Sequence, residues 1–178
     1  MPGPVRRMLK DSSRFLLAGV RAALAEPVDA TRETLDGWRR GERELVKEPF
    51  ALARLLSDAM ADVTVTCAQL GIDLLYEQPA HQHDVPLDGK RVRAALEAIL
   101  HAAMREFGQD TTIRVRIDQV DGRTAIEISA ERAACERLQA RLGETDCDLF
   151  AAAEILAAHG AELVVGGEGD RTALIAKF

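Results

Sequence analysis

The residues of this chain whose types could do chemistry are few, and the clearest group is a histidine pair. His81 and His83 stand one residue apart with Asp84 beside them, and imidazole and carboxylate groups are common ligands of zinc. No further ligand follows at a fixed spacing, and the pair lies in a polar stretch. We therefore favour a solvated loop over a metal site, and we expect no resident metal or cofactor.

The other two histidines lie in predicted helices. His101 falls on the polar face with Arg93 and Arg105, so we expect a solvent-exposed side chain, with a phosphoacceptor role as the alternative. His159 is followed by Gly160, and a glycine directly after an apolar helical pattern is typical of a helix C-terminus. A capping role is the preferred interpretation of His159.

The sequence indicates neither a phosphate-binding loop nor a catalytic nucleophile. The run Gly166-Gly167-Glu168-Gly169 is rich in glycine, but neither a helix start nor a Lys-Ser/Thr pair follows it, so a hairpin turn is expected. No Ser-His-Asp or Cys-His set is discernible. Three cysteines without metal-ligand spacing indicate reduced thiols rather than a disulfide framework. They are Cys67, Cys135 and Cys147.

Charge is unevenly spread along the 178 residues, whose net charge is −6. Residues 1–50 hold ten Lys and Arg against eight Asp and Glu, whereas residues 51–178 hold thirteen against twenty-one. The acidic body argues against nucleic-acid binding, which needs clustered basic residues. No apolar run approaches the ~20 residues of a membrane span, and Arg21 interrupts the segment that resembles a signal peptide. We expect a cytoplasmic protein without a membrane contact.

Periodic patterns of apolar residues predict the elements that must position these side chains. Steps of three and four residues predict helices, and alternation predicts strands. We expect helices at 12–25, 29–40, 51–70, 90–107, 131–142 and 148–159, and strands at 44–50, 72–76, 84–88, 112–120, 124–129, 162–165 and 172–178. This order predicts an α+β fold, a two-layer sandwich in which helices cover one face of a mixed sheet.

Alanines gather in the helix expected at 90–107. Because small side chains allow helices to approach closely, we interpret this patch as a packing surface rather than the floor of a ligand site. Its members are Ala94, Ala95, Ala98, Ala102 and Ala103.

Residues 15–178 resemble the core of sensor histidine kinases, whose ATP-binding domain has the fold shared with gyrase and the heat-shock chaperone ATPases. The resemblance is carried by residues 48–56, 71–74 and 85–92 and by the C-terminal order of apolar helix, His-Gly, strand, glycine-rich turn and strand. It implies a helical dimerisation segment at 1–43 and an ATPase-type domain at 44–178. It also implies the same two-layer sandwich.

At the positions where that family binds nucleotide, the resemblance places other residues here. The Mg²⁺-ligating Asn falls on Ala102, within Ile99-Leu100-His101-Ala102-Ala103, and a methyl group cannot bind magnesium. The adenine-binding Asp falls near Ala130, with no glycine after it. The glycine-rich helix start for the phosphates corresponds to Asp148-Leu149-Phe150-Ala151. The resemblance therefore implies a nucleotide site that has lost its ligands.

The N-terminal part resembles the family's phosphoacceptor segment, with Ala22 where the phosphorylated His would stand. An apolar helical stripe outside the sandwich must be covered, which predicts a homodimer. The two arginines at the end of the second helix form either a solvated face or a partner contact. The candidate partner-binding residues are Phe15, Val20, Leu24, Arg39 and Arg40.

These patterns favour a catalytically inactive relative of sensor histidine kinases that regulates by binding. The resemblance implies a partner from two-component signalling, either the receiver domain of a response regulator or an authentic kinase. Two alternatives stay open. A histidine phosphotransfer protein needs an exposed His on the dimerising helices, and the residues before 44 contain none. An ATP-binding, anti-sigma-like regulator would be stabilised by Mg-ATP.

Overall fold

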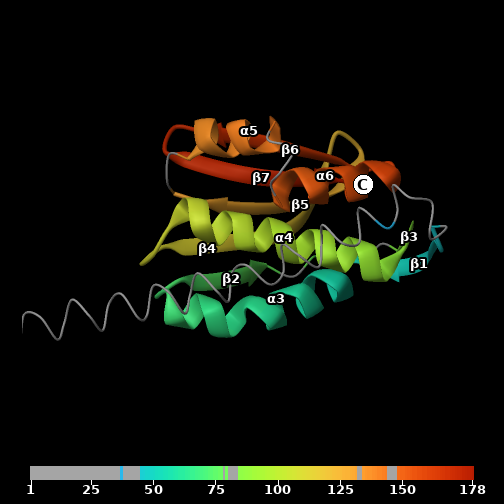
Figure 1. The fold of residues 1–178 in the computed structure, drawn as a ribbon, viewed down its shortest axis with the longest axis horizontal. Helices are drawn as coiled ribbons and strands as arrows, with labels where there is room; N and C mark the ends of the chain where they lie inside the picture. The colour runs from blue at the N-terminus through green and yellow to red at the C-terminus, as the bar shows by residue number, and fades with distance from the viewer. Residues whose placement is uncertain (1–36, 38–44, 78, 80–83, 132–133, 144–147) are drawn as a thin grey trace, which may run out of the picture.

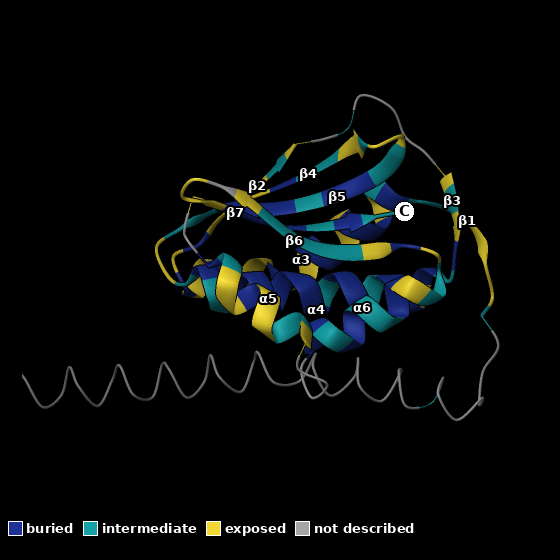
Figure 2. Ribbon diagram, turned by 90° about the horizontal axis from the view of Figure 1, so that it is seen from above, coloured by how far each residue is buried: buried dark blue, intermediate teal, exposed yellow. Residues whose placement is uncertain are grey.

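The computed structural model describes residues 37, 45–77, 79, 84–131, 134–143 and 148–178. A five-stranded sheet forms one layer of this part of the chain, and helices form the other (Figure 1). The described helices all cover the same face of the sheet, and we call the opposite face, which none of them covers, the open face (Figure 2). The predicted α+β, two-layer architecture is confirmed.

Three helices begin and end within one residue of the predicted positions, whereas the helix expected at 131–142 begins at Cys135. α4 begins where the Asp88 carboxylate accepts a hydrogen bond from the Arg91 amide at 3.2 Å. It ends at Gly108, whose φ of +83° is costly for any residue with a side chain. The helices of the described part are α3 (Leu52–Gln69), α4 (Gly89–Phe107), α5 (Cys135–Gly143) and α6 (Asp148–Ala158).

The main sheet has the strand order β2-β4-β5-β7-β6. β2 runs parallel to β4, and the other neighbours are antiparallel, so the sheet is mixed as predicted. Its strands are β2 (Asp73–Glu77), β4 (Thr112–Val120), β5 (Arg123–Ala130), β6 (Glu162–Glu168) and β7 (Arg171–Lys177). The remaining strands, β1 (Glu48–Ala51) and β3 (Asp84–Leu87), pair with each other at one end of the molecule (Figure 1).

Helix α4 lies between α3 and α6 and contacts both (Figure 1). Its alanines permit this close approach, and the packing interpretation of the patch is confirmed for the four members that are fully buried: Ala95, Ala98, Ala102 and Ala103. Between the helices and the sheet lie larger apolar side chains from both layers, among them Leu56, Leu96, Ile113 and Ile128. The helix layer and the sheet thus share one core.

Several predictions from the sequence fall outside the described residues. These are the two helices before residue 44, with Phe15, Val20, Ala22, Leu24, Arg39 and Arg40, the histidines at 81 and 83, and Cys147. Within the residues that the structure describes, no helix combines the length and apolar character needed to cross a bilayer.

The glycine-rich run near the C-terminus belongs largely to strand β6, and only its last glycine lies in the turn. The sequence predicted a turn over the whole run, but Gly166 and Gly167 pair with residues of β7, and the turn follows at Gly169, whose φ is +60°. A side chain at Gly167 would overlap the Arg171 carbonyl oxygen. The glycine there permits close strand approach, which local sequence could not reveal.

Replacing Gly167 with alanine should therefore destabilise the protein, whereas Gly166→Ala should be nearly neutral. At 167 the new methyl group meets backbone that cannot move without shifting the hairpin, at a cost of about 1–3 kcal/mol. At 166 the methyl group would lie 3.5 Å from Ile175 Cδ1, an ordinary contact. Urea unfolding of the two variants would measure the difference, and equal midpoints would contradict this explanation.

Candidate functional site

The nucleotide-binding positions expected from the sequence lie in the packed core. Ala102 on α4 is fully buried, and Ala130 at the end of β5 is nearly so. Both belong to the same hydrophobic cluster as Leu149 and Ala151 of α6. Since α6 packs directly along α4 (Figure 2), we call this region the α4–α6 seam. Ala22 lies outside the described residues.

A buried carboxylate stands at the first residue of α6. Asp148 is only 2% exposed, and its two oxygens accept hydrogen bonds from Arg105 at 2.8 and 2.7 Å. One oxygen also accepts from the Leu149 amide at 3.1 Å. Unpaired N–H groups and the helix dipole stabilise a negative charge at such an end. The helix start to which the resemblance assigns nucleotide phosphates therefore already holds an anion of the chain itself.

A second charged group holds α5 against the C-terminal end of α4. The Glu106 carboxylate contacts Nε of Arg137 at 3.1 Å and Nε of Arg141 at 3.0 Å. Arg137 also donates to the Glu106 carbonyl oxygen at 3.1 Å. Because Arg137 is exposed and Arg141 is half-buried, these pairs fix position more than they add stability. They set where α5 lies against α4.

His101 is buried, with 5% of its surface exposed, so the prediction of a solvent-exposed side chain is wrong. Periodicity placed it on the polar face of α4, but α6 packs against that helix and brings Asp148 close. Burial lowers the pKa of His101, Arg105 lowers it further, and Asp148 opposes this. Among the described residues its Nδ1 has no hydrogen-bond partner. A buried neutral imidazole is a poor phosphoacceptor.

His159 connects the end of α6 to the start of α4. Its Nδ1 lies 2.7 Å from the Ile155 carbonyl oxygen, which can only accept, so Nδ1 carries the proton. Nε2 then accepts a hydrogen bond from the Asp88 amide at 3.1 Å. Gly160 follows with a φ of +78°. These bonds agree with the helix-end role predicted for His159.

Acid should destabilise the protein through these two histidines. Burial is the main cause that lowers the pKa of both His101 and His159 in the folded state. The histidines of the unfolded chain titrate near the ordinary value of about 6.5, so the unfolded chain binds more protons than the folded protein below that pH. The free energy of unfolding therefore decreases as the pH is lowered.

The urea midpoint measured between about pH 7.5 and pH 5.5 should report this loss. Protonated His159 would also lose the bond it accepts from Asp88. In the variant His101→Leu the decline should be shallower. A midpoint that is flat, or that rises on acidification, would show that these imidazoles are not held neutral.

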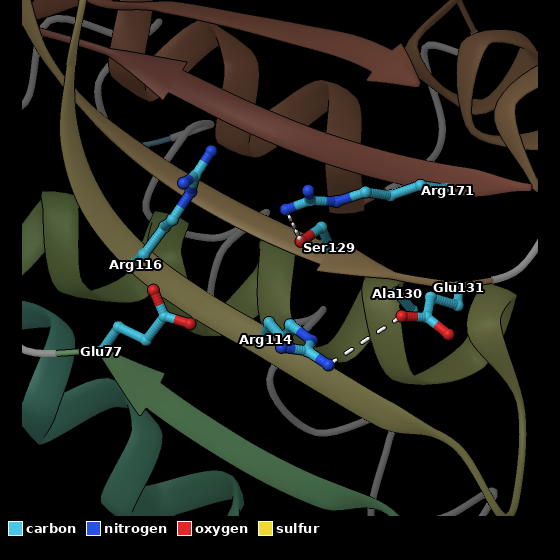
Figure 3. Close-up of a pocket in the computed structure, with 7 residues that line it drawn as sticks. All are labelled: Glu77, Arg114, Arg116, Ser129, Ala130, Glu131 and Arg171. Carbon is cyan, nitrogen blue, oxygen red and sulfur yellow. Dashed lines mark hydrogen bonds and ion pairs between the residues drawn. The ribbon is translucent and has the colours of Figure 1, made fainter. Parts of the chain in front are cut away.

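A group of arginines on the open face of the sheet was not predicted from the sequence. A hollow of about 260 Å³ lies there, and Figure 3 shows the side chains around it. It is lined by Glu77, Arg114, Arg116, Ser129, Ala130, Glu131 and Arg171. The alternation of arginines with buried residues in β4 was the available signal, but only the placement of the helices tells which face is open.

Among the described residues, no three His, Cys, Asp or Glu side chains are arranged to hold a metal ion. Asp84 lies in β3, while its neighbouring histidines are outside the described part. Cys67 is buried in α3 and Cys135 lies in α5, and both are free thiols. The thiol of Cys67 packs 3.8 Å from the sulfur of Met104.

No protein-family model matches the sequence, and no curated protein matches it significantly. Solved structures do match. The cytoplasmic segment of histidine kinase QseC has 15% identity and a TM-score of 0.67, covering 85% of this chain and 93% of that one. A histidine kinase from Burkholderia phymatum has 22% identity and a TM-score of 0.60, covering 84% and 77%.

A third match is histidine kinase ThkA in complex with the response regulator TrrA, at 14% identity and a TM-score of 0.66, covering all of this chain and 52% of that one. At such identities the likeness establishes the fold and not the activity. It agrees with the element order, the mixed sheet and the one-sided helix layer described above. The chain therefore has the fold of histidine-kinase catalytic domains.

Proposed function

We propose that this protein is a catalytically inactive, histidine-kinase-like regulator that acts by binding a protein partner in two-component signalling. The observation that supports it best is the buried carboxylate of Asp148 at the start of α6, which is paired with the partly buried Arg105 of α4. Nucleotide phosphates brought to that helix end would meet a carboxylate rather than free N–H groups. Binding there would require the phosphates to displace this carboxylate from Arg105 and from the Leu149 amide.

The packing around Ala102 supports the same proposal. Magnesium bound to a nucleotide needs oxygen ligands from the protein, and this fully buried methyl group offers none. His101, the neighbouring residue, is itself buried and neutral. A nucleotide could enter the α4–α6 seam only by separating two helices that share a core.

For the partner we propose the receiver domain of a response regulator, with an authentic histidine kinase as the second choice. The ThkA structure, in which a kinase of this fold is bound to a response regulator, supports the first. Homodimerisation through residues 1–43 and a cytoplasmic location complete the proposal. The match to a cytoplasmic kinase segment favours that location.

The test compares nucleotide and partner binding by the full chain. We expect Mg-ATP to leave the melting temperature unchanged, whereas a real site would add ~2.7 kcal/mol at a hundredfold excess over Kd. No phosphate should transfer from labelled ATP to the chain. Calorimetry against the host's receiver domains and kinase cores should then find a saturable partner. Stabilisation by Mg-ATP would instead support the ATP-binding regulator, and acid-labile phosphate on a His the phosphotransfer protein.

A further inference from the structure

We propose that the arginine-lined hollow on the open face of the sheet binds a small oxyanion, a carboxylate or phosphoryl group of a ligand. The hollow opens on the face of the sheet opposite the helix layer, and apart from Ala130, which also belongs to the core, its lining residues lie outside the α4–α6 seam. Anion binding at this hollow is also independent of the proposed function, because it requires neither the loss of nucleotide binding nor the binding of a protein partner.

The register of the strands creates this hollow. One row of outward positions runs from Arg114 on β4 through Ser129 on β5 and Ala173 on β7 to Gly166 on β6. After the arginine, each residue in this row is small, which leaves room above the row for longer side chains from the neighbouring rows. The adjacent rows carry the long side chains of Arg116 and Arg171, and Arg171 reaches across the row to Ser129 (Figure 3).

Glu127 fixes two of the arginines that line the hollow. Its carboxylate, 12% exposed, accepts from Arg116 at 2.8 and 3.2 Å and from Arg171 at 2.5 Å. Arg171 also donates to the buried hydroxyl of Ser129 at 3.1 Å. A guanidinium has five N–H donors, so both retain donors beyond these bonds. Arginines fixed in this way lose little conformational freedom when they bind.

The third guanidinium, that of Arg114, is the least engaged. Among the described residues its ion pair is with Glu131 at 3.9 Å, and both side chains are exposed. An arriving oxyanion can replace this long contact with a bidentate one, which is the geometry that guanidinium favours for carboxylate and phosphate.

The carboxylates around the hollow select for a small anion rather than a highly charged one. Glu77 and Glu131 line it and are exposed, Glu127 is already engaged, and Asp118 lies 3.6 Å from Arg116. A polyanion would meet these four charges, whereas a single oxyanion group can lie between the arginines. The volume of about 260 Å³ falls just below the range of about 300–1,000 Å³ for drug-sized ligands.

The experiment is calorimetric titration of the full chain at low ionic strength with inorganic phosphate and, separately, with succinate. We expect saturable binding of at least one probe, and Arg114→Gln and Arg171→Gln should each weaken it about tenfold or more. Tighter phosphate binding identifies a phosphoryl ligand, and tighter succinate binding a carboxylate.

The matched control is Arg93→Gln on α4, an arginine of similar exposure that pairs with Asp62 and Glu97 on the helix side. It should bind the probes as the unmodified chain does. Arg114→Gln removes no hydrogen bond to a described residue, so it should keep the unmodified melting temperature even if Arg171→Gln does not. Absence of saturable binding for both probes, or equal weakening in Arg93→Gln, overturns the proposal.

Discussion

Asp148→Ala should lower the free energy of unfolding by about 2–4 kcal/mol, because it leaves the Arg105 guanidinium in a packed site without its carboxylate. Loss of one partner of a fully buried pair costs about 3–5 kcal/mol. Arg105 is 26% exposed, so water compensates for part of that cost. The substitution also removes the negative charge at the start of α6. Urea unfolding followed by circular dichroism would measure the change.

The control is Asp62→Ala, since Asp62 pairs with Arg93 on the exposed surface of the helix layer. That loss should stay below about 1 kcal/mol, as for other exposed ion pairs. The double variant Arg105→Met, Asp148→Ala should be less destabilised than the sum of the single variants, because no unpaired charge remains. If Asp148→Ala cost no more than Asp62→Ala, the pair would not anchor α6.

The sequence alone predicts the elements that are determined by residues close together in the chain. The apolar residues of α3, which recur at steps of three and four from Leu52 to Cys67, are buried as a single stripe. Asp121 and Gly122 have φ of +55° and +76°, which are the values that a tight hairpin between β4 and β5 requires. Each of these structures is determined by residues close in the chain, so pattern and outcome agree.

What the sequence did not predict depends on contacts between distant elements. The burial of His101 follows from α6, more than forty residues further along the chain. The hollow on the open face arises from positions that share a row only once β4, β5, β7 and β6 are in register. Polar character alone does not separate the buried His101 of α4 from the exposed Arg114 of β4, because the packing of the helices decides which position is covered.

Ala102→Asn, which would return a magnesium ligand to the position that the resemblance implies, should destabilise the protein and still not bind Mg-ATP. The larger side chain has no room in a fully buried position of α4, and overpacking costs about 1–3 kcal/mol. A buried amide without partners adds about 1–3 kcal/mol. Urea unfolding and a thermal shift with Mg-ATP would measure both outcomes.

Ala94→Asn is the matched control, because it makes the same change in the same helix at a half-buried position. It should cost no more than the difference in helix propensity, about 0.7 kcal/mol or less. Suppose instead that Ala102→Asn were as stable as Ala94→Asn and gained a melting shift with Mg-ATP. The α4–α6 seam would then open readily, and one missing amide, rather than the packed core and the carboxylate of Asp148, would account for the proposed inactivity.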